Sequence, residues 1–137
     1  MDATLHIREE RRRVLQEELD AAKTQAERNH LGQFATPSLL ALDILTAAQR
    51  LMPQGQNIRF LAPAFGTGAF YSALLRVFPG NRLAAAEGYE IDPHYGAPTA
   101  SLWADTNLRL HVEDFTRAEA PGPEGQCNLL GLVGACD

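Results

Sequence analysis

Residues 57–77 read NIRFLAPAFGTGAFYSALLRV and carry the clearest structural signal in the chain. The apolar start of this segment predicts a short strand, and residues 69–77 predict a helix with an apolar inner face. The loop between them, residues 62–68, contains Gly66 and Gly68, which let the backbone approach a ligand closely. The N-terminus of the helix offers free N–H groups to such a ligand. A G-x-G pair by itself is weak evidence for a ligand site, so the interpretation depends on the residues around it.

The alternation of strands and helices continues downstream. Residues 84–90 and 108–112 predict two further strands, residues 97–106 a weaker helix, and residues 127–133 a fourth strand. This order is typical of a parallel α/β sheet. Ligands bind such sheets at the carboxyl ends of the strands.

Two helices are expected upstream. Residues 3–29 predict one polar helix, whose run Arg11-Arg12-Arg13 is either a phosphate contact or a solvated face. The glutamates beside this run favour the solvated face. A second helix is expected from Thr36 as N-cap, with Pro37 in its first turn, to about Leu51. Because this helix is apolar nearly all round, it should be buried.

Two acids follow the predicted strands. Glu90 lies 22 residues after Gly68 at the end of the second strand, where a carboxylate can accept both hydroxyls of a ribose. Asp114 follows the third strand, where it can accept a hydrogen bond from an exocyclic amine such as that of adenine. Each acid alone is compatible with a solvated strand end, but together behind a glycine loop they favour a nucleoside site. The third glycine of a dinucleotide fingerprint would fall at Tyr71, which disfavours a nicotinamide cofactor.

Composition limits the class of protein. The 137 residues include 12 basic and 17 acidic side chains, for a formal net charge of -5, which disfavours a free-standing nucleic-acid binder. A catalytic domain that grips DNA elsewhere is still compatible with this charge. Two cysteines are too few for a disulfide scaffold, and the four histidines lack metal-ligand spacing. The sequence predicts no secretory signal and no membrane span, so we expect a cytoplasmic protein.

Four motifs follow one another along the chain: LGQFATP at 31–37, APAFGTGAF at 62–70, GYEIDP at 88–93 and EDF at 113–115. This order resembles the gamma-type adenine-specific (N6) DNA methyltransferases of bacterial restriction–modification systems. The resemblance implies a partial Rossmann-like, S-adenosylmethionine-dependent methyltransferase fold with a parallel sheet and helices on both faces. The domain would cover residues 30–137, preceded by an N-terminal helix over residues 1–29.

The resemblance also assigns residues to the methyl donor, S-adenosylmethionine. Thr36 would touch its methionine end, Glu90 its ribose hydroxyls, and Asp114 its adenine amine. The full expected set is Phe34, Thr36, Pro63, Phe65, Gly66, Gly68, Glu90, Ile91, Asp114 and Phe115. Phe34 and Phe65 are equally compatible with plain core positions, and Phe70 is best interpreted as core.

Two departures from the family matter. The family usually has an acid where this chain has Ala62, and that acid holds the ammonium group of the donor. The family's catalytic motif, Asn/Asp/Ser-Pro-Pro-Tyr/Phe/Trp, follows the fourth strand, whereas here no proline follows Pro123. The chain is therefore interpreted as an N-terminal piece ended by a stop or frame shift near residue 130, for which we expect donor binding at best and little or no turnover. Its fourth strand would leave a sheet edge to which a partner chain could pair.

The family implies an adenine in DNA as the target. Three alternatives stay open: a non-catalytic module that binds a nucleoside or docks on a partner, a methyltransferase acting on RNA or a small molecule, and, least favoured, a nicotinamide oxidoreductase.

Overall fold

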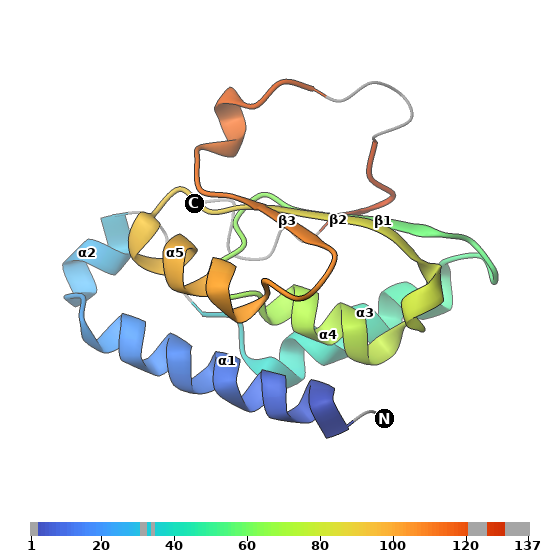
Figure 1. Ribbon diagram of the computed structural model, residues 1–137, viewed down its shortest axis with the longest axis horizontal. Coiled ribbons are helices and arrows are strands. Elements are labelled where there is room, and N and C mark those ends of the chain that lie inside the picture. Colours follow the sequence, from blue (N-terminus) through green and yellow to red (C-terminus); the bar gives the residue numbers. More distant parts are fainter. Residues whose placement is uncertain (1–2, 31–32, 34, 121–125, 131–137) are drawn as a thin grey trace.

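The computed structural model describes residues 3–30, 33, 35–120 and 126–130. Within these residues the chain is a mixed α/β protein built on a four-stranded parallel sheet in the order β3-β2-β1-β4 (Figure 1). The strands are β1 Ile58–Ala62, β2 Leu83–Tyr89, β3 Leu108–His111 and β4 Leu129–Leu130. The helices are α1 Ala3–Ala21, α2 Gln25–His30, α3 Ser38–Leu51, α4 Ala69–Val77 and α5 Pro93–Leu102, with short 3-10 turns η1 Gly80–Arg82 and η2 Phe115–Arg117.

The strand order places a topological switch point at β1. Strand β1 pairs with β2 on one side and with β4 on the other, while β3 adds outside β2. In open parallel sheets the crevice at such a reversal, beyond the carboxyl ends of the strands, is where ligands bind. The predicted glycine loop follows β1 directly and therefore lies at this crevice.

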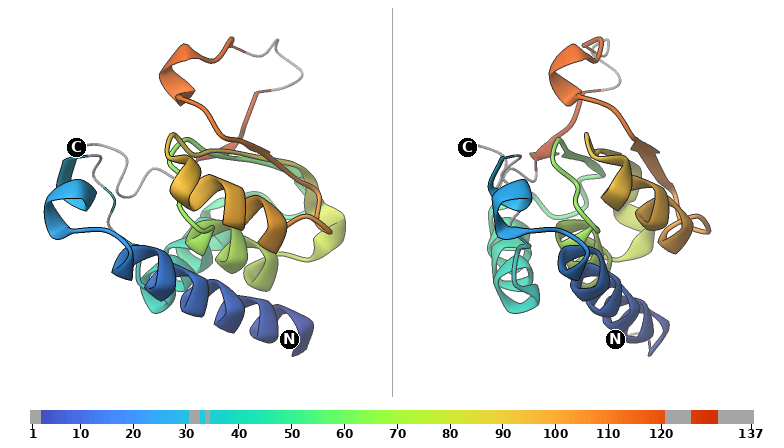
Figure 2. Two further views of the ribbon diagram at one scale, coloured as in Figure 1. Left: turned by 60° about the vertical axis from the view of Figure 1, so that its left-hand side comes forward. Right: turned by 90° about the vertical axis from the view of Figure 1, so that its left-hand side faces the viewer.

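The described helices lie on one side of the sheet, and η2 lies on the other side (Figures 1 and 2). The prediction of helices on both faces is therefore wrong for the described part of the chain. The connections β1–α4–β2 and β2–α5–β3 extend the sheet in the same direction, and crossovers of one hand then put both helices on the same face.

The core lies between the sheet and this helical layer. It contains Ile58, Phe60 and Ala62 of β1, Ala86 of β2, and most of α4. Phe70 of α4 is buried, which confirms it as a core residue. On the opposite face of the sheet Ala85, Arg109 and Leu130 are exposed.

The N-terminal segment is two helices, so the prediction of one helix over 3–29 is wrong. Helix α1 ends at Ala21, and α2 restarts at Gln25 behind a capping box. The backbone N–H of Glu27 donates to the Thr24 hydroxyl at 3.1 Å, and the Thr24 N–H donates to the Glu27 carboxylate at 2.9 Å. The signal T-x-x-E is present in the sequence and marks this second start.

Helix α3 begins one residue later than predicted. Pro37 is its N-cap residue and no side chain caps it, so Thr36 does not have the predicted capping role. The expectation of full burial is also wrong: Ala41 and Leu45 are buried against α4, whereas Leu39 and Leu51 are 76% and 86% exposed. One face of a 14-residue helix is enough to pack against a single neighbour, so apolar residues on the other faces gain no burial.

The later elements differ from prediction in their limits. Helix α5 starts at Pro93, not near residue 97, because Asp92 caps it and Pro93 takes its first position, where proline is favourable. Strand β4 is described over Leu129–Leu130, and residues 131–133 of the predicted strand lie outside the described residues. Within the described ranges, no helix combines the length and the apolar character needed to cross a bilayer.

Candidate functional site

Two turns meet at the carboxyl ends of β1 and β2. The first is the glycine loop, residues 63–68, and the second is the β2–α5 turn, residues 90–92. Phe65 N–H donates to the Tyr89 carbonyl at 2.8 Å, and Gly66 N–H donates to Glu90 Oε1 at 2.9 Å. The second carboxylate oxygen of Glu90 accepts from Asp92 N–H at 3.0 Å. One carboxylate therefore bridges the backbones of both turns.

Glu90 is nearly buried, at 7% exposure. Burial raises the pKa of this carboxyl above its ordinary value and outweighs the two backbone hydrogen bonds and Lys23, which act in the opposite direction. The charge of Asp92 raises it further. A carboxylate with two bound N–H groups still has acceptor capacity on both oxygens. Glu90 can therefore take further donors, such as a pair of hydroxyls, at the rim of the loop.

The glycine loop has a tightly specified backbone. Gly66 and Gly68 have positive φ angles of 61° and 97°, a region that L side chains rarely adopt. A Cβ on Gly68 would also lie 2.8 Å from Nε1 of Trp103. The same Nε1 donates to the carbonyl of Thr67 at 2.9 Å, beneath the loop. The ring of Phe65 is buried there, so it supports the loop from inside the core.

Helix α1 also reaches the glycine loop, which corrects the interpretation of Arg11-Arg12-Arg13 as a solvated face at Arg12, whereas Arg11 and Arg13 are exposed. Arg12 is 2% exposed, and its Nη1 donates to the Thr67 hydroxyl at 3.0 Å. Its Nε and Nη2 donate to the carboxylate of buried Glu9 at 2.7 and 2.9 Å. The Thr67 hydroxyl in turn donates to Gln16 Oε1 at 2.6 Å.

Glu9 is held ionised in this network. Burial by itself would raise its pKa, but hydrogen bonds from Arg12 and Ser38 and the Arg12 charge outweigh burial and lower the pKa to about 2. Ser38 is the first residue of α3, so the Glu9 carboxylate joins α1 to the start of α3 as well.

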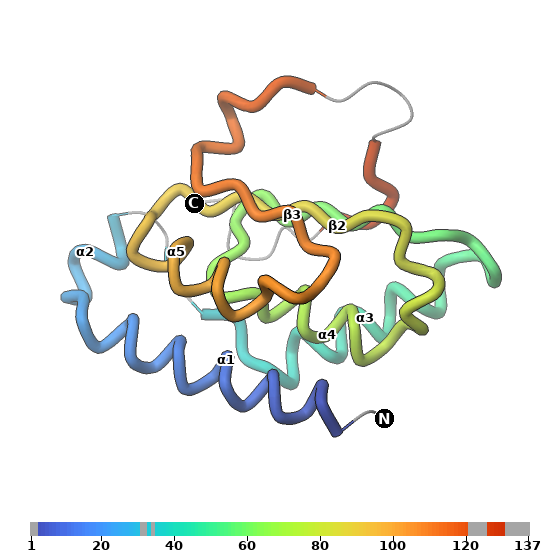
Figure 3. Tube along the Cα trace, in the orientation of Figure 1, coloured from blue at the N-terminus to red at the C-terminus, as the bar shows by residue number. Residues whose placement is uncertain are grey.

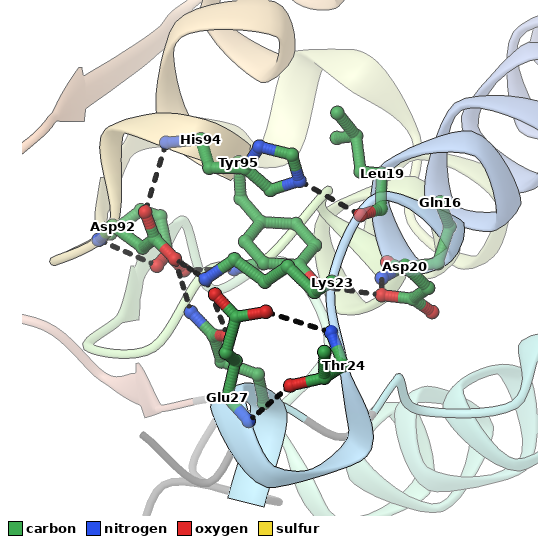
Figure 4. Close-up of polar contacts among 12 residues, drawn as sticks. Gln16, Leu19, Asp20, Lys23, Thr24, Glu27, Asp92, His94 and Tyr95 are labelled. Atoms are coloured by element: carbon green, nitrogen blue, oxygen red, sulfur yellow. Dashed lines mark hydrogen bonds and ion pairs between the residues drawn. The ribbon is translucent and has the colours of Figure 1, made fainter. Parts of the chain in front are cut away.

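The β2–α5 turn has its own contacts with the N-terminal segment (Figure 4). Asp92 accepts from His94 N–H at 2.9 Å as the cap of α5. Its other oxygen accepts from Lys23 Nζ and, at 2.7 Å, from the side-chain amide of Gln33. Gln33 belongs to the first predicted motif, so the structure places this residue of the motif at the end of β2.

The remaining predicted site residues are more loosely placed. Asp114 accepts from Thr116 N–H at 2.9 Å and from the Thr116 hydroxyl at 2.7 Å, which lower the pKa of its carboxyl. Among the described residues no hydrogen bond or ion pair joins Asp114 to Glu90 or to the glycine loop. The Phe115 ring packs edge-on against Tyr89 with centroids 5.2 Å apart. Phe115 therefore lies beside the end of β2, where its ring can offer apolar surface to a ligand.

Four further predicted residues complete the set. Ile91, between Glu90 and Asp92, is half exposed, and Pro63 and Thr36 are partly buried. Phe34 lies outside the described residues. A shallow depression between α1 and α5, lined by Ile7, Val14, Leu15, Pro98 and Leu102 among others, contains none of the predicted residues.

Sequence reasoning missed Arg12, Gln16, Lys23 and Thr67. The helical spacing of Glu9 and Arg12 is a signal for an ion pair, but nothing in the sequence marks that pair as buried. In the described part of the chain, no group of three His, Cys, Asp or Glu side chains is placed to hold a metal ion. No known protein-family model matches the chain.

Proposed function

We propose that this chain binds the nucleoside part of S-adenosylmethionine at the ends of β1 and β2. The observation that carries the proposal is the position of Glu90, whose nearly buried carboxylate joins the glycine loop to the β2–α5 turn. A carboxylate at the end of the second strand of a Rossmann-like fold accepts ribose hydroxyls. The parallel sheet, the switch point at β1 and the glycine loop support that fold.

The site residues fit the nucleoside half of S-adenosylmethionine better than its methionine half. Glu90 has free acceptor capacity for the ribose, and Ile91 and Phe115 offer apolar surface beside it for a base. At the methionine end, Ala62 is buried and apolar, so this position offers no partner for an ammonium group. We therefore assign nucleoside recognition to this chain and expect weak retention of the amino-acid end.

The wider function follows from the motif order. We propose that the chain represents the donor-binding part of an adenine-specific DNA methyltransferase of the restriction–modification type. When bound, S-adenosylmethionine would supply an electrophilic methyl group for adenine N6. The sequence contains no Asn-Pro-Pro-Tyr motif, so the proposal for this chain is donor binding, and methyl transfer is proposed for a protein that carries the motif.

A second candidate is a nucleoside-binding module without transfer chemistry. The apolar Ala62 position favours it, because such a module has no need to hold an ammonium group. The two candidates differ in ligand preference: a donor-binding domain favours S-adenosylmethionine and S-adenosylhomocysteine, whereas a nucleoside module binds adenosine equally well.

The test is calorimetric titration of the chain with S-adenosylhomocysteine, with adenosine, and with NAD⁺ as a control. Glu90→Gln replaces one acceptor oxygen by an amide and should weaken nucleoside binding by about tenfold or more. Glu87→Gln is the matched control, because Glu87 lies on the same strand and pairs with Arg109 and His111 on the other face. Absence of binding at millimolar ligand, or equal affinity in Glu90→Gln, would contradict the proposal.

A further inference from the structure

Helix α1 and Lys23, which follows it, contact both turns of the candidate site, although they lie outside the motifs that suggested the site. The helix runs along the outer side of α4 and α5, and it contacts the glycine loop and the first turn of α5 (Figure 3). The contacts with the two turns are polar and specific, and they involve different parts of this N-terminal segment.

The first contact is the Arg12–Thr67 anchor. Thr67 is 1% exposed and lies between two glycines with positive φ, and its hydroxyl is the polar side-chain group of the glycine loop. Arg12 donates to this hydroxyl, and the hydroxyl donates to Gln16. Glu9 fixes the Arg12 fork through two hydrogen bonds, which is the geometry in which a guanidinium loses least freedom.

The second contact is the Lys23–Asp92 anchor, in which Lys23 lies two residues beyond the end of α1. Lys23 Nζ donates to Asp92, and its ammonium also lies 5.3 Å from the centroid of the Tyr95 ring. Nearby, His94 Nε2 donates to the carbonyl of Leu19 at 2.8 Å, and the Tyr95 hydroxyl donates to Asp20 at 2.7 Å (Figure 4). The last turn of α1 and the residues that follow it thereby hold the first turn of α5.

A helix is stiff, and the seven-residue step from Arg12 to Leu19 of α1 spans about 10 Å. Arg12 holds the glycine loop from α1 itself, and Lys23 holds the β2–α5 turn from just beyond the end of this helix. Glu90 bridges the same two turns from inside the site.

We propose that α1, together with Lys23 just after it, is a positioning element of the nucleoside site: the Arg12 and Lys23 anchors hold the glycine loop and the β2–α5 turn at the spacing that ligand binding requires. This inference rests on the proposed function and deepens it, because it adds positioning residues that do not touch the ligand. Loss of either anchor frees one turn and makes the ligand order it on binding, so affinity falls.

Two small substitutions test the anchors. Thr67→Val keeps the shape of the side chain and removes the hydroxyl, whereas Thr67→Ser keeps the hydroxyl and serves as the rescue. Lys23→Met removes the ammonium group that donates a hydrogen bond to Asp92. Arg12→Met is less informative because it removes the two hydrogen bonds that Arg12 donates to the buried Glu9 carboxylate, a loss that destabilises the whole fold. Asp105→Asn is the matched control, since it weakens the pairing of α1 Arg8 at the other end of α5.

Two measurements are made on each variant. NMR amide hydrogen exchange of Gly66, Gly68 and Asp92 reports the order of the turns without ligand, with Leu45 in α3 as the reference amide. Calorimetry with S-adenosylhomocysteine reports affinity. We expect Thr67→Val to raise exchange at Gly66 and Gly68 about tenfold and to weaken binding by a similar factor. Lys23→Met should raise exchange at the Asp92 amide and weaken binding by similar factors. Exchange at the Leu45 amide should stay unchanged in both variants.

Unchanged exchange and unchanged affinity in Thr67→Val and Lys23→Met would overturn the inference. Equal effects in Asp105→Asn, or a rise at Leu45 as large as at Gly66, would also overturn it, because they would indicate a general loss of stability. If the unsubstituted chain binds no nucleoside while Thr67→Val still loosens Gly66, the proposed function fails and the ordering of the loop by α1 stands.

Discussion

The ring of Phe65 occupies the space that a side chain at Gly88 would need. A Cβ built on Gly88 lies 2.4 Å from Cδ2 of Phe65, well inside van der Waals contact. Phe65 belongs to the glycine loop after β1, and Gly88 lies on β2, next to the residues that pair with that loop. The missing side chain at 88 thus lets the loop fold back against the neighbouring strand.

Gly88→Ala should therefore destabilise the protein. The added methyl group must displace a buried ring, and overpacking of this kind costs about 1–3 kcal/mol. Urea unfolding followed by circular dichroism measures the effect. Gly80→Ala is the control, because nothing lies within 4 Å of a Cβ at that position. Equal free energies of unfolding in the two variants would contradict the packing described for Phe65.

Stability should fall in acid because of Glu9. The pKa of its carboxyl is about 2 in the folded protein against 4.5 in the unfolded reference, so between these values the unfolded chain binds more protons. The contribution is complete above about pH 5 and is lost as the pH falls toward 2, with an upper limit of about 3 kcal/mol.

The pH dependence is measured by urea unfolding of the parent and of Glu9→Gln between pH 2.5 and about 6. The comparison is needed because the raised pKa of Glu90 acts with the opposite sign and is common to both proteins. The difference in stability between the two should shrink as the pH is lowered. A difference that is constant over this range would contradict the ionised Glu9–Arg12 pair.

Trp103→Phe should destabilise the glycine loop by removing a hydrogen bond that supports it. Trp103 is 2% exposed, and its indole N–H is the donor to the Thr67 carbonyl. Phenylalanine retains an aromatic ring against Tyr71 but leaves that carbonyl without its donor, at a cost of about 1–3 kcal/mol. Chemical unfolding gives the free energy, and amide exchange at Gly68 gives the local effect. A loss below about 0.5 kcal/mol would argue against this hydrogen bond.

Ala62→Asp tests the methionine end of the proposed site. An acid at this position should hold an ammonium group and tighten S-adenosylmethionine by about tenfold relative to adenosine. Ala62 is buried, so the variant should also be less stable than the parent when no ligand is present. Ala62→Asn is the neutral control, for which no such preference is expected. If the ratio of the two dissociation constants is the same in all three proteins, Ala62 does not face the donor.

Much of the strand and helix order could be predicted from the sequence, because each element has its own periodicity and its own start or stop residues. The glycine loop followed by a helix, the parallel arrangement and the placement of Glu90 at the end of β2 are confirmed, although Ala62 belongs to β1 and the loop begins at residue 63. The capping box at Thr24 and the Asp92-Pro93 helix start were also encoded locally, through backbone N–H groups within three residues. The nucleoside ligand and the methyltransferase class stay predictions.

The sequence could not decide which of two similar ion pairs is buried at the candidate site. Glu9–Arg12 and Glu10–Arg13 have the same residue types and the same spacing on one helix. In the fold, the first pair is buried against Thr67, and the second is exposed at 3.2 Å between its charged atoms. A shift of one residue turns a helix by about 100°, so only the docking of α1 on α4 and α5 determined which arginine reaches the site. Local pattern thus determined the elements and their order, and tertiary packing determined which side chains the two turns share.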